Sequence, residues 1–215
     1  MKELLYKEFK LVSHPTTFMF LALSAMILIP NYPYYISFFY TTLGLYFTFL
    51  SARENSDIFY TMTLPVRKTD IVKASMAFVI IIELLQVILA VPFAIIRTTY
   101  SLPENAVGIE ANVAFFGLSL IMLGLFNYIF FSIYYKNPDK VGKAFGVSSI
   151  IVFVYIIIAE TLINAVPIAK KYLDTLDPEY LSIKLVILLI GIAIYVALNL
   201  LVYKKSIKNF EVLDL

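Results

Sequence analysis

Residues Arg53–Lys73 have the sequence RENSDIFYTMTLPVRKTDIVK and form a polar segment between two very apolar stretches. Ser56 or Asp57 can cap a short helix there, and Leu64-Pro65 ends it. The segment also carries four basic residues and a second helix start. A chain embedded in lipid has no need of such an insertion unless something outside the membrane binds to it. We therefore interpret residues 52–73 as a cytoplasmic docking segment.

The composition is that of an integral membrane protein. Hydrophobic residues make up 61% of the 215 residues and charged residues 15%, and the mean hydropathy is +0.87. Soluble domains are about half apolar and a quarter charged. The net charge of +2 is too small to indicate a nucleic-acid partner. The lack of cysteine excludes disulfide scaffolds and thiolate metal sites, and the length predicts one transmembrane domain over residues 1–215.

The apolar pattern predicts an all-α protein with six transmembrane helices. Residues 1–15 form an arm in which Lys2–Val12 is amphipathic, and this pattern is typical of a helix lying in the membrane interface. The long apolar stretch that follows is divided by a turn signal at Asn31-Tyr32-Pro33. The predicted membrane spans are 16–30, 34–51, 74–96, 111–135, 144–166 and 183–203.

The basic residues predict the orientation of these spans. The arm has three Lys or Arg residues, the connection after the second span four, the connection after the fourth three, and the tail three. The opposite side has four, namely Arg97, Lys170, Lys171 and Lys184. Because cytoplasmic loops carry the excess of Lys and Arg, we expect both termini in the cytoplasm.

Polar side chains inside the predicted spans form a second candidate site. Glu83 and Gln86 share one helical face of the third span, Asn127 lies in the fourth and Glu160 in the fifth. Ionisable groups in a membrane are costly and usually face the bundle interior with a partner. They indicate either a polar path for substrate or hydrogen bonds that hold the helices together. A carrier that works alone with Glu83 as its titrating group is one function compatible with this pattern.

Motifs of enzymes are absent from the sequence. It has no G-x-x-x-x-G-K-[ST] phosphate loop, no H-E-x-x-H and no G-x-S-x-G motif. His14 is its one histidine. We therefore predict neither an enzyme nor a bound cofactor or metal. Glycine pairs with spacings that allow close helix packing are Gly117 with Gly124 and Gly142 with Gly146.

The run Glu54–Ala74 resembles a pattern of small ABC-2-type transporter permeases, D-x-x-Y-x-x-L-P-[VI]-x-[RK]-x-[DE]-[IV]-V-x-[AG]-[KR]. The predicted arm, six spans and loop after the second span also resemble that family over the whole chain. The group that it resembles most is the six-span permeases of bacterial exporters for amphipathic peptides, such as phenol-soluble modulins. The chain departs from the pattern at Ser75, where a basic residue is common, and it has one residue more than the pattern between Tyr60 and Leu64.

The resemblance implies a permease subunit in the bacterial cytoplasmic membrane that exports a substrate, for example an amphipathic peptide. Two permease copies, identical or paralogous, would pair with two separate ATPase subunits, which bind the ATP. It further implies that the loop after the second span is a coupling helix seated on the ATPase, with contacts from Asp57, Ile58, Phe59, Tyr60 and Met62. The alternatives are the solitary carrier or a membrane-embedded immunity protein.

Overall fold

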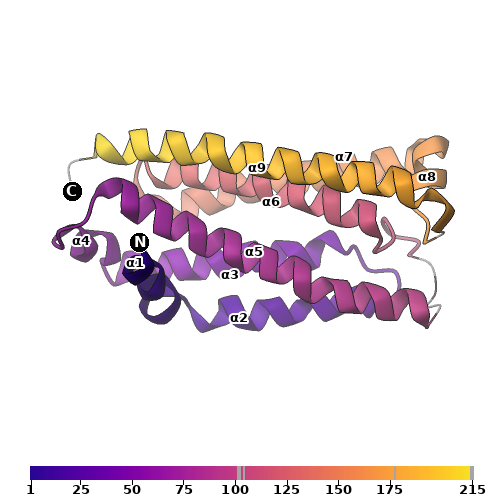
Figure 1. Cartoon of the computed structure of the whole chain (residues 1–215), viewed down its shortest axis with the longest axis horizontal. Helices are drawn as coiled ribbons and strands as arrows, with labels where there is room; N and C mark the ends of the chain where they lie inside the picture. Colours follow the sequence, from indigo (N-terminus) through magenta and orange to yellow (C-terminus); the bar gives the residue numbers. More distant parts are fainter. Residues whose placement is uncertain (101–102, 104, 177, 214–215) are drawn as a thin grey trace.

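The computed structural model describes residues 1–100, 103, 105–176 and 178–213. Over these residues the chain is helical and contains no strand. Its long helices run roughly parallel to the long axis of the molecule (Figure 1). The longer helices are α3 (Tyr35–Glu54), α5 (Lys68–Thr99), α6 (Val113–Tyr134), α7 (Val141–Ala165) and α9 (Leu181–Glu211). The shorter ones are α1 (Lys2–Lys7), α2 (Pro15–Leu21), α4 (Asp57–Met62) and α8 (Pro167–Leu173).

Non-α turns extend or precede several of these helices. The π-helical turn η1 (Glu8–Val12) continues α1, and the 3₁₀ helix η2 (Ala22–Leu28) continues α2. Two short 3₁₀ turns, η3 (Pro138–Lys140) and η4 (Pro178–Tyr180), precede α7 and α9. The predicted interfacial helix Lys2–Val12 is therefore helical throughout but changes its winding at Glu8.

Local capping signals explain where some helices begin. The Asn112 side chain accepts hydrogen bonds from the backbone N–H groups of Ala114 and Phe115 at 2.9 and 3.2 Å and so caps α6. His14 caps α2 in the same way through the N–H of Thr16 at 3.3 Å, with Pro15 at the first helical position. The single histidine is thus a helix cap.

Four helical segments in the described chain are long and apolar enough to cross a membrane: α5, α6, α9, and α7 together with η3. A fifth is present if Lys2–Val12 and Pro15–Leu28, which meet at 88°, count as one broken span. The predicted span 34–51 corresponds to α3, whose tyrosine and threonine residues lower its hydropathy, and the predicted span 16–30 is interrupted where α2 becomes η2. The connection between the two long helices is also shorter than the predicted residues 52–73, because α3 continues to Glu54 and α5 begins at Lys68.

The two ends of the bundle carry different features. The N-terminus, the C-terminus and α4 lie at one end, and α8 lies at the other (Figure 1). We call these the terminal end and the α8 end. This arrangement places the basic residues of the arm, the polar segment and the tail together at the terminal end.

Aromatic rings and glycines hold the bundle together. Phe115 of α6 packs against Tyr34, Tyr35 and Phe38, with ring centroids 5.2–6.1 Å apart. A side chain at Gly117 would meet the α9 backbone at 2.7 Å, and one at Gly124 would meet it at 3.2 Å, which confirms the prediction of close packing at this glycine pair. Nothing lies within 4 Å of the corresponding positions at Gly142 and Gly146. The G-x-x-x-G spacing there marks no helix contact within this chain.

Candidate functional site

A short helix, α4, projects at the terminal end of the bundle (Figure 1). Ser56 precedes it with φ 54° and ψ 34°, in the left-handed region that non-glycine residues adopt rarely. This residue reverses the chain between α3 and α4. Asp57 lies in the first turn of α4, where its negative charge is favourable at the positive end of the helix dipole. The predicted short helix is therefore present, and Ser56 starts it through its backbone conformation rather than through a side-chain cap.

The inner face of α4 is fastened to the N-terminal arm by one lysine. The Lys7 ammonium donates to the Asp57 carboxylate at 2.7 Å and to the Thr61 hydroxyl at 2.9 Å. Thr61 is fully buried, and the Lys7 and Asp57 side chains are mostly buried. Because both bonds come from one ammonium group, α1 and α4 are held together as one unit.

The outer face of α4 is aromatic and open. Phe59 and Tyr60 are 62% and 65% exposed. Ile58 and Met62 point the other way and pack against the hydrophobic core. Of the five predicted coupling residues, two therefore face outward, and Asp57, Ile58 and Met62 attach the helix to the rest of the protein.

A buried carboxyl group continues this attachment to α5. Glu8 is 3% exposed, and its carboxyl accepts a hydrogen bond from the Ser75 hydroxyl of α5 at 3.1 Å. Burial raises the pKa of Glu8 to about 7, while the neighbouring Lys7 cation, 3.6 Å away, opposes that rise. Contacts thus run from α4 through Lys7 and Glu8 to α5. Ser75, at the α5 end of these contacts, is a position where the chain departs from the family pattern.

The intramembrane carboxylate Glu83 lies at a junction of three helices. Its Oε2 atom accepts hydrogen bonds from the Tyr195 hydroxyl of α9 at 2.6 Å and from the Asn127 side-chain amide of α6 at 2.8 Å. Asn127 also donates to Asn199 at 3.1 Å. Glu83 and Asn127 are fully buried. The expectation that Glu83 has a polar partner from another span is confirmed, and Tyr195 is the partner that sequence reasoning missed.

The other two predicted polar residues do not share these bonds. Gln86 is fully buried on the same helix as Glu83, but neither polar atom of its side chain has a hydrogen-bond partner. Glu160 is only half-buried and accepts a hydrogen bond from the backbone N–H of Ile109 at 3.0 Å. Glu160 thus binds the loop at the α8 end and shares no hydrogen bond with Glu83.

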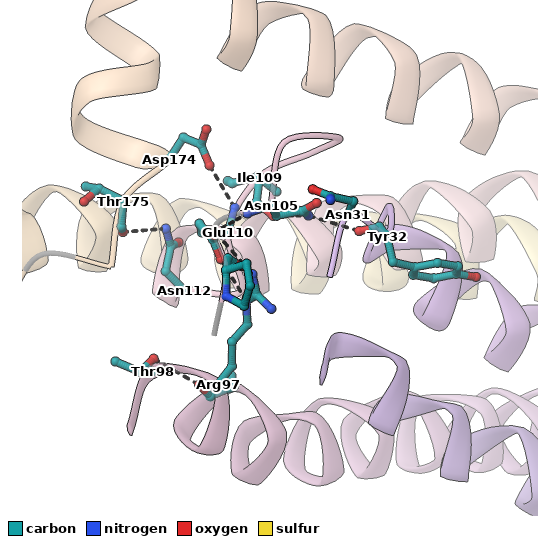
Figure 2. Close-up of polar contacts among 12 residues, drawn as sticks. Asn31, Tyr32, Arg97, Thr98, Asn105, Ile109, Glu110, Asn112, Asp174 and Thr175 are labelled. Atoms are coloured by element: carbon teal, nitrogen blue, oxygen red, sulfur yellow. Dashed lines mark hydrogen bonds and ion pairs between the residues drawn. The ribbon is translucent and has the colours of Figure 1, made fainter. Parts of the chain in front are cut away.

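That loop contains a buried ion pair that the sequence did not reveal. Arg97 of α5, which we predicted as a charge of the outer surface, is fully buried and pairs with Glu110 at 3.0 Å (Figure 2). The guanidinium also donates to the carbonyl of Pro103 and lies 5.3 Å from the centre of the Tyr34 ring. The sequence shows only that Arg97 and Glu110 have opposite charges and lie on either side of one connection. It gives no information on the distance between them.

The loop around Glu110 joins elements from the whole α8 end, and we call residues 105–112 the α8-end clasp. Asn105 donates to the carbonyl of Tyr32 at 3.0 Å, which ties the clasp to the turn before α3. The Glu110 N–H donates to Asp174 at 2.9 Å, after α8, and the Asn112 amide donates to the Thr175 carbonyl at 3.0 Å. Figure 2 shows these side chains converging from separate segments. These contacts of the clasp are all hydrogen bonds.

The polar groups described above lie in separate parts of the bundle. Within the described ranges, no group of three or more His, Cys, Asp or Glu side chains could hold a metal ion. The arrangement offers instead an exposed aromatic face at one end, a buried polar junction in the middle and a polar clasp at the other end.

The model of one protein family, described as ABC-2 family transporter protein, matches residues 3–211. The chain belongs to the ABC-2 transporter family. This match covers nearly the whole chain, from α1 to the end of α9. No curated protein matches the chain, and no solved structure matches it.

Membership of the ABC-2 family agrees with the apolar helices and supports a multi-pass membrane protein. It also supports a transmembrane permease subunit of an ABC transporter that associates with an ATPase, rather than the catalytic ATPase itself. The resemblance of the polar segment to ABC-2 permeases is thereby confirmed at the level of the family.

Proposed function

We propose that the protein is the permease subunit of an ABC exporter and that a separate ATPase docks on the outer face of α4. The observation that carries the proposal is the exposure of Phe59 and Tyr60 on a helix whose inner face is fixed by Lys7. A six-residue helix with two exposed aromatic rings suits a groove on a partner, since aromatic side chains are typical anchors of interfaces. Asp57, Ile58 and Met62 would keep α4 attached to the rest of the protein when the ATPase moves it.

A force that the partner applies to α4 would reach the long helices by two routes. The chain connection from Ser56 leads directly into α3, and the Lys7 bonds lead into the arm, whose Glu8 is bonded to Ser75 of α5. Movement of packed helices as near-rigid bodies is a common form of such transitions. Closure of an ATP-bound partner would thus shift α3 and α5 together.

The same proposal includes six spans with both termini in the cytoplasm of a bacterial cell. Residues 16–30 and α3 would supply the first two spans as a hairpin. Its α2 packs against α3 and its η2 against α5, and such packing against protein tolerates a broken helix. Two permease copies, identical or paralogous, would assemble with two ATPase subunits that bind ATP. The exported substrate that we favour is an amphipathic peptide, on the resemblance of the polar segment alone.

The docking role predicts a specific effect of Phe59→Asp. We expect this variant to bind the ATPase about 30-fold more weakly or worse, because truncating an interface anchor costs roughly 2 kcal/mol or more. Co-purification in mild detergent and ATP-driven transport in vesicles would measure the loss. Val107→Asp is the matched control, since Val107 is 51% exposed at the opposite end. Normal complex recovery with normal transport in Phe59→Asp would refute docking on α4.

The orientation predicts a labelling pattern that needs no background correction, because the chain has no cysteine. An impermeant thiol reagent added to intact cells should label Val107→Cys and Lys171→Cys, which are exposed near the α8 end. It should label Tyr60→Cys and Lys140→Cys only after the cells are opened. Labelling of Tyr60→Cys in intact cells would reverse the proposed orientation.

A further inference from the structure

The hydrogen bonds of Glu83 are distributed unequally between its two oxygen atoms. Oε2 accepts both available donors, the Tyr195 hydroxyl and the Asn127 amide. Oε1 is buried and has no partner. An ionised carboxylate spreads its charge over both oxygens and accepts at both, whereas a carboxylic acid accepts at one oxygen and donates from the other. Acceptance at Oε2 alone fits the second pattern, and it leaves Oε1 available to carry a proton.

The surroundings of Glu83 also favour a neutral carboxyl group, because the described part of the chain holds no ion-pair partner for it. The ion pairs among the described residues involve other carboxylates, and Glu83 takes part in none of them. Its polar neighbours are Asn127 from α6 and Tyr195 from α9, and Tyr195 is the titratable group that contacts it. Glu83 also lies well inside a span, where an unpaired charge is costly. A neutral carboxyl group removes that cost.

Two side chains near Glu83 have acceptor atoms without a hydrogen-bond partner. The Gln86 carboxamide, one turn further along the same face of α5, has no partner for its oxygen or its nitrogen. The carbonyl oxygen of Asn127 is also without a donor. Protonation of Oε1 would place an O–H donor in the part of the core that contains these acceptor oxygens.

We propose that Glu83 is a proton-binding site, with the proton on Oε1, and that the resting protein carries a neutral carboxylic acid at the junction of α5, α6 and α9. The proton is the ligand, and the step is simple binding of H⁺ to a carboxylate oxygen. Its role is to let a single side chain of α5 bond to both α6 and α9 without placing a charge between them. This inference does not depend on the docking of an ATPase.

Infrared spectroscopy of the purified chain in lipid tests the site directly. Glu8 and Glu160 are other carboxyls with strong burial or unusual surroundings, so the background is the Glu8→Gln/Glu160→Gln variant. Glu110 is buried as well, and it stays in this background because it is paired with the Arg97 guanidinium. At neutral pH this background should show the C=O stretching band of a protonated carboxyl, shifted by ¹³C-glutamate. Adding Glu83→Gln should remove the band completely. Persistence of the band, or its absence from the background protein, would overturn the proposal.

Two further measurements keep the result decisive. The ¹³C-glutamate shift requires no change at position 83, so it shows whether the background protein holds a protonated glutamate even if Glu83→Gln does not fold. Replacing Na⁺ by choline should leave the band unchanged. A band that grows when Na⁺ is removed would identify Glu83 as a sodium site and contradict resting protonation. Because no ATPase is present, these outcomes are separate from those of the docking experiment.

Discussion

Arg97→Met is expected to destabilise the folded protein by about 3–5 kcal/mol, the usual cost of removing one partner from a buried ion pair. The substitution leaves the Glu110 carboxylate, 5% exposed, without its cation. It also removes the donor to the Pro103 carbonyl and the contact with the Tyr34 ring. Because Glu110 organises the clasp, we expect loss of order across the α8 end. Thermal unfolding in detergent, followed by intrinsic tyrosine fluorescence or light scattering, would measure the effect.

Two comparisons separate the ion pair from a general effect of losing an arginine. Arg53→Met removes a partly exposed arginine whose Glu54 partner is 63% exposed, and such surface pairs contribute about 0–1 kcal/mol. The double variant Arg97→Met/Glu110→Gln removes the stranded charge and should recover part of the stability lost in Arg97→Met. If Arg97→Met were no more harmful than Arg53→Met, the ion pair would not be holding the clasp.

Gly191→Ala is expected to lower stability by roughly 1–3 kcal/mol or more, as overpacking of a tight core does. A Cβ atom at Gly191 would fall against the backbone carbonyl of Gly117, closer than van der Waals contact permits. The obstacle is backbone rather than a flexible side chain, so α6 and α9 would have to separate. That movement would also strain the Glu83 junction, which joins α5 to both helices. The melting temperature of the purified variant measures the loss.

Gly146→Ala is the matched control for this prediction. Gly146 is also inside a membrane helix, α7, but nothing lies within 4 Å of the position of its Cβ. Removing a helix-interior glycine is expected to be neutral or stabilising, by up to about 1 kcal/mol. Equal melting temperatures for Gly191→Ala and Gly146→Ala would show that α6 and α9 are not packed as closely as described.

Much of the helical architecture was predictable because its signals are local. Spans 111–135 and 144–166 agree with α6 and α7 to within three residues, since their ends are marked by Asn112 and by the connection around Pro138. The hairpin before the polar segment was less accurate. Its first helix changes from α to 3₁₀ winding after Leu21, a break that no proline or glycine in that stretch announces.

The candidate sites were predictable in part for the same reason. The short helix α4 follows from the spacing of Ile58, Phe59 and Met62 before Pro65, but which of them face outward depends on where Lys7 binds. Glu83 stood out as a charge in an apolar span. The clasp did not, because its residues come from connections whose composition is ordinary.

The sequence by itself determined the class of the protein, the position of the polar segment and the side of the molecule on which the basic residues gather. These features depend on composition and on periodicity within a few turns of one helix. Only the tertiary structure decided that Lys7 bonds to Asp57 fifty residues later, that Arg97 is buried against Glu110, and that Glu83 meets Tyr195 across 112 residues. The physical reason is that these bonds form between helices, and their partners are selected by how the helices pack rather than by any local pattern.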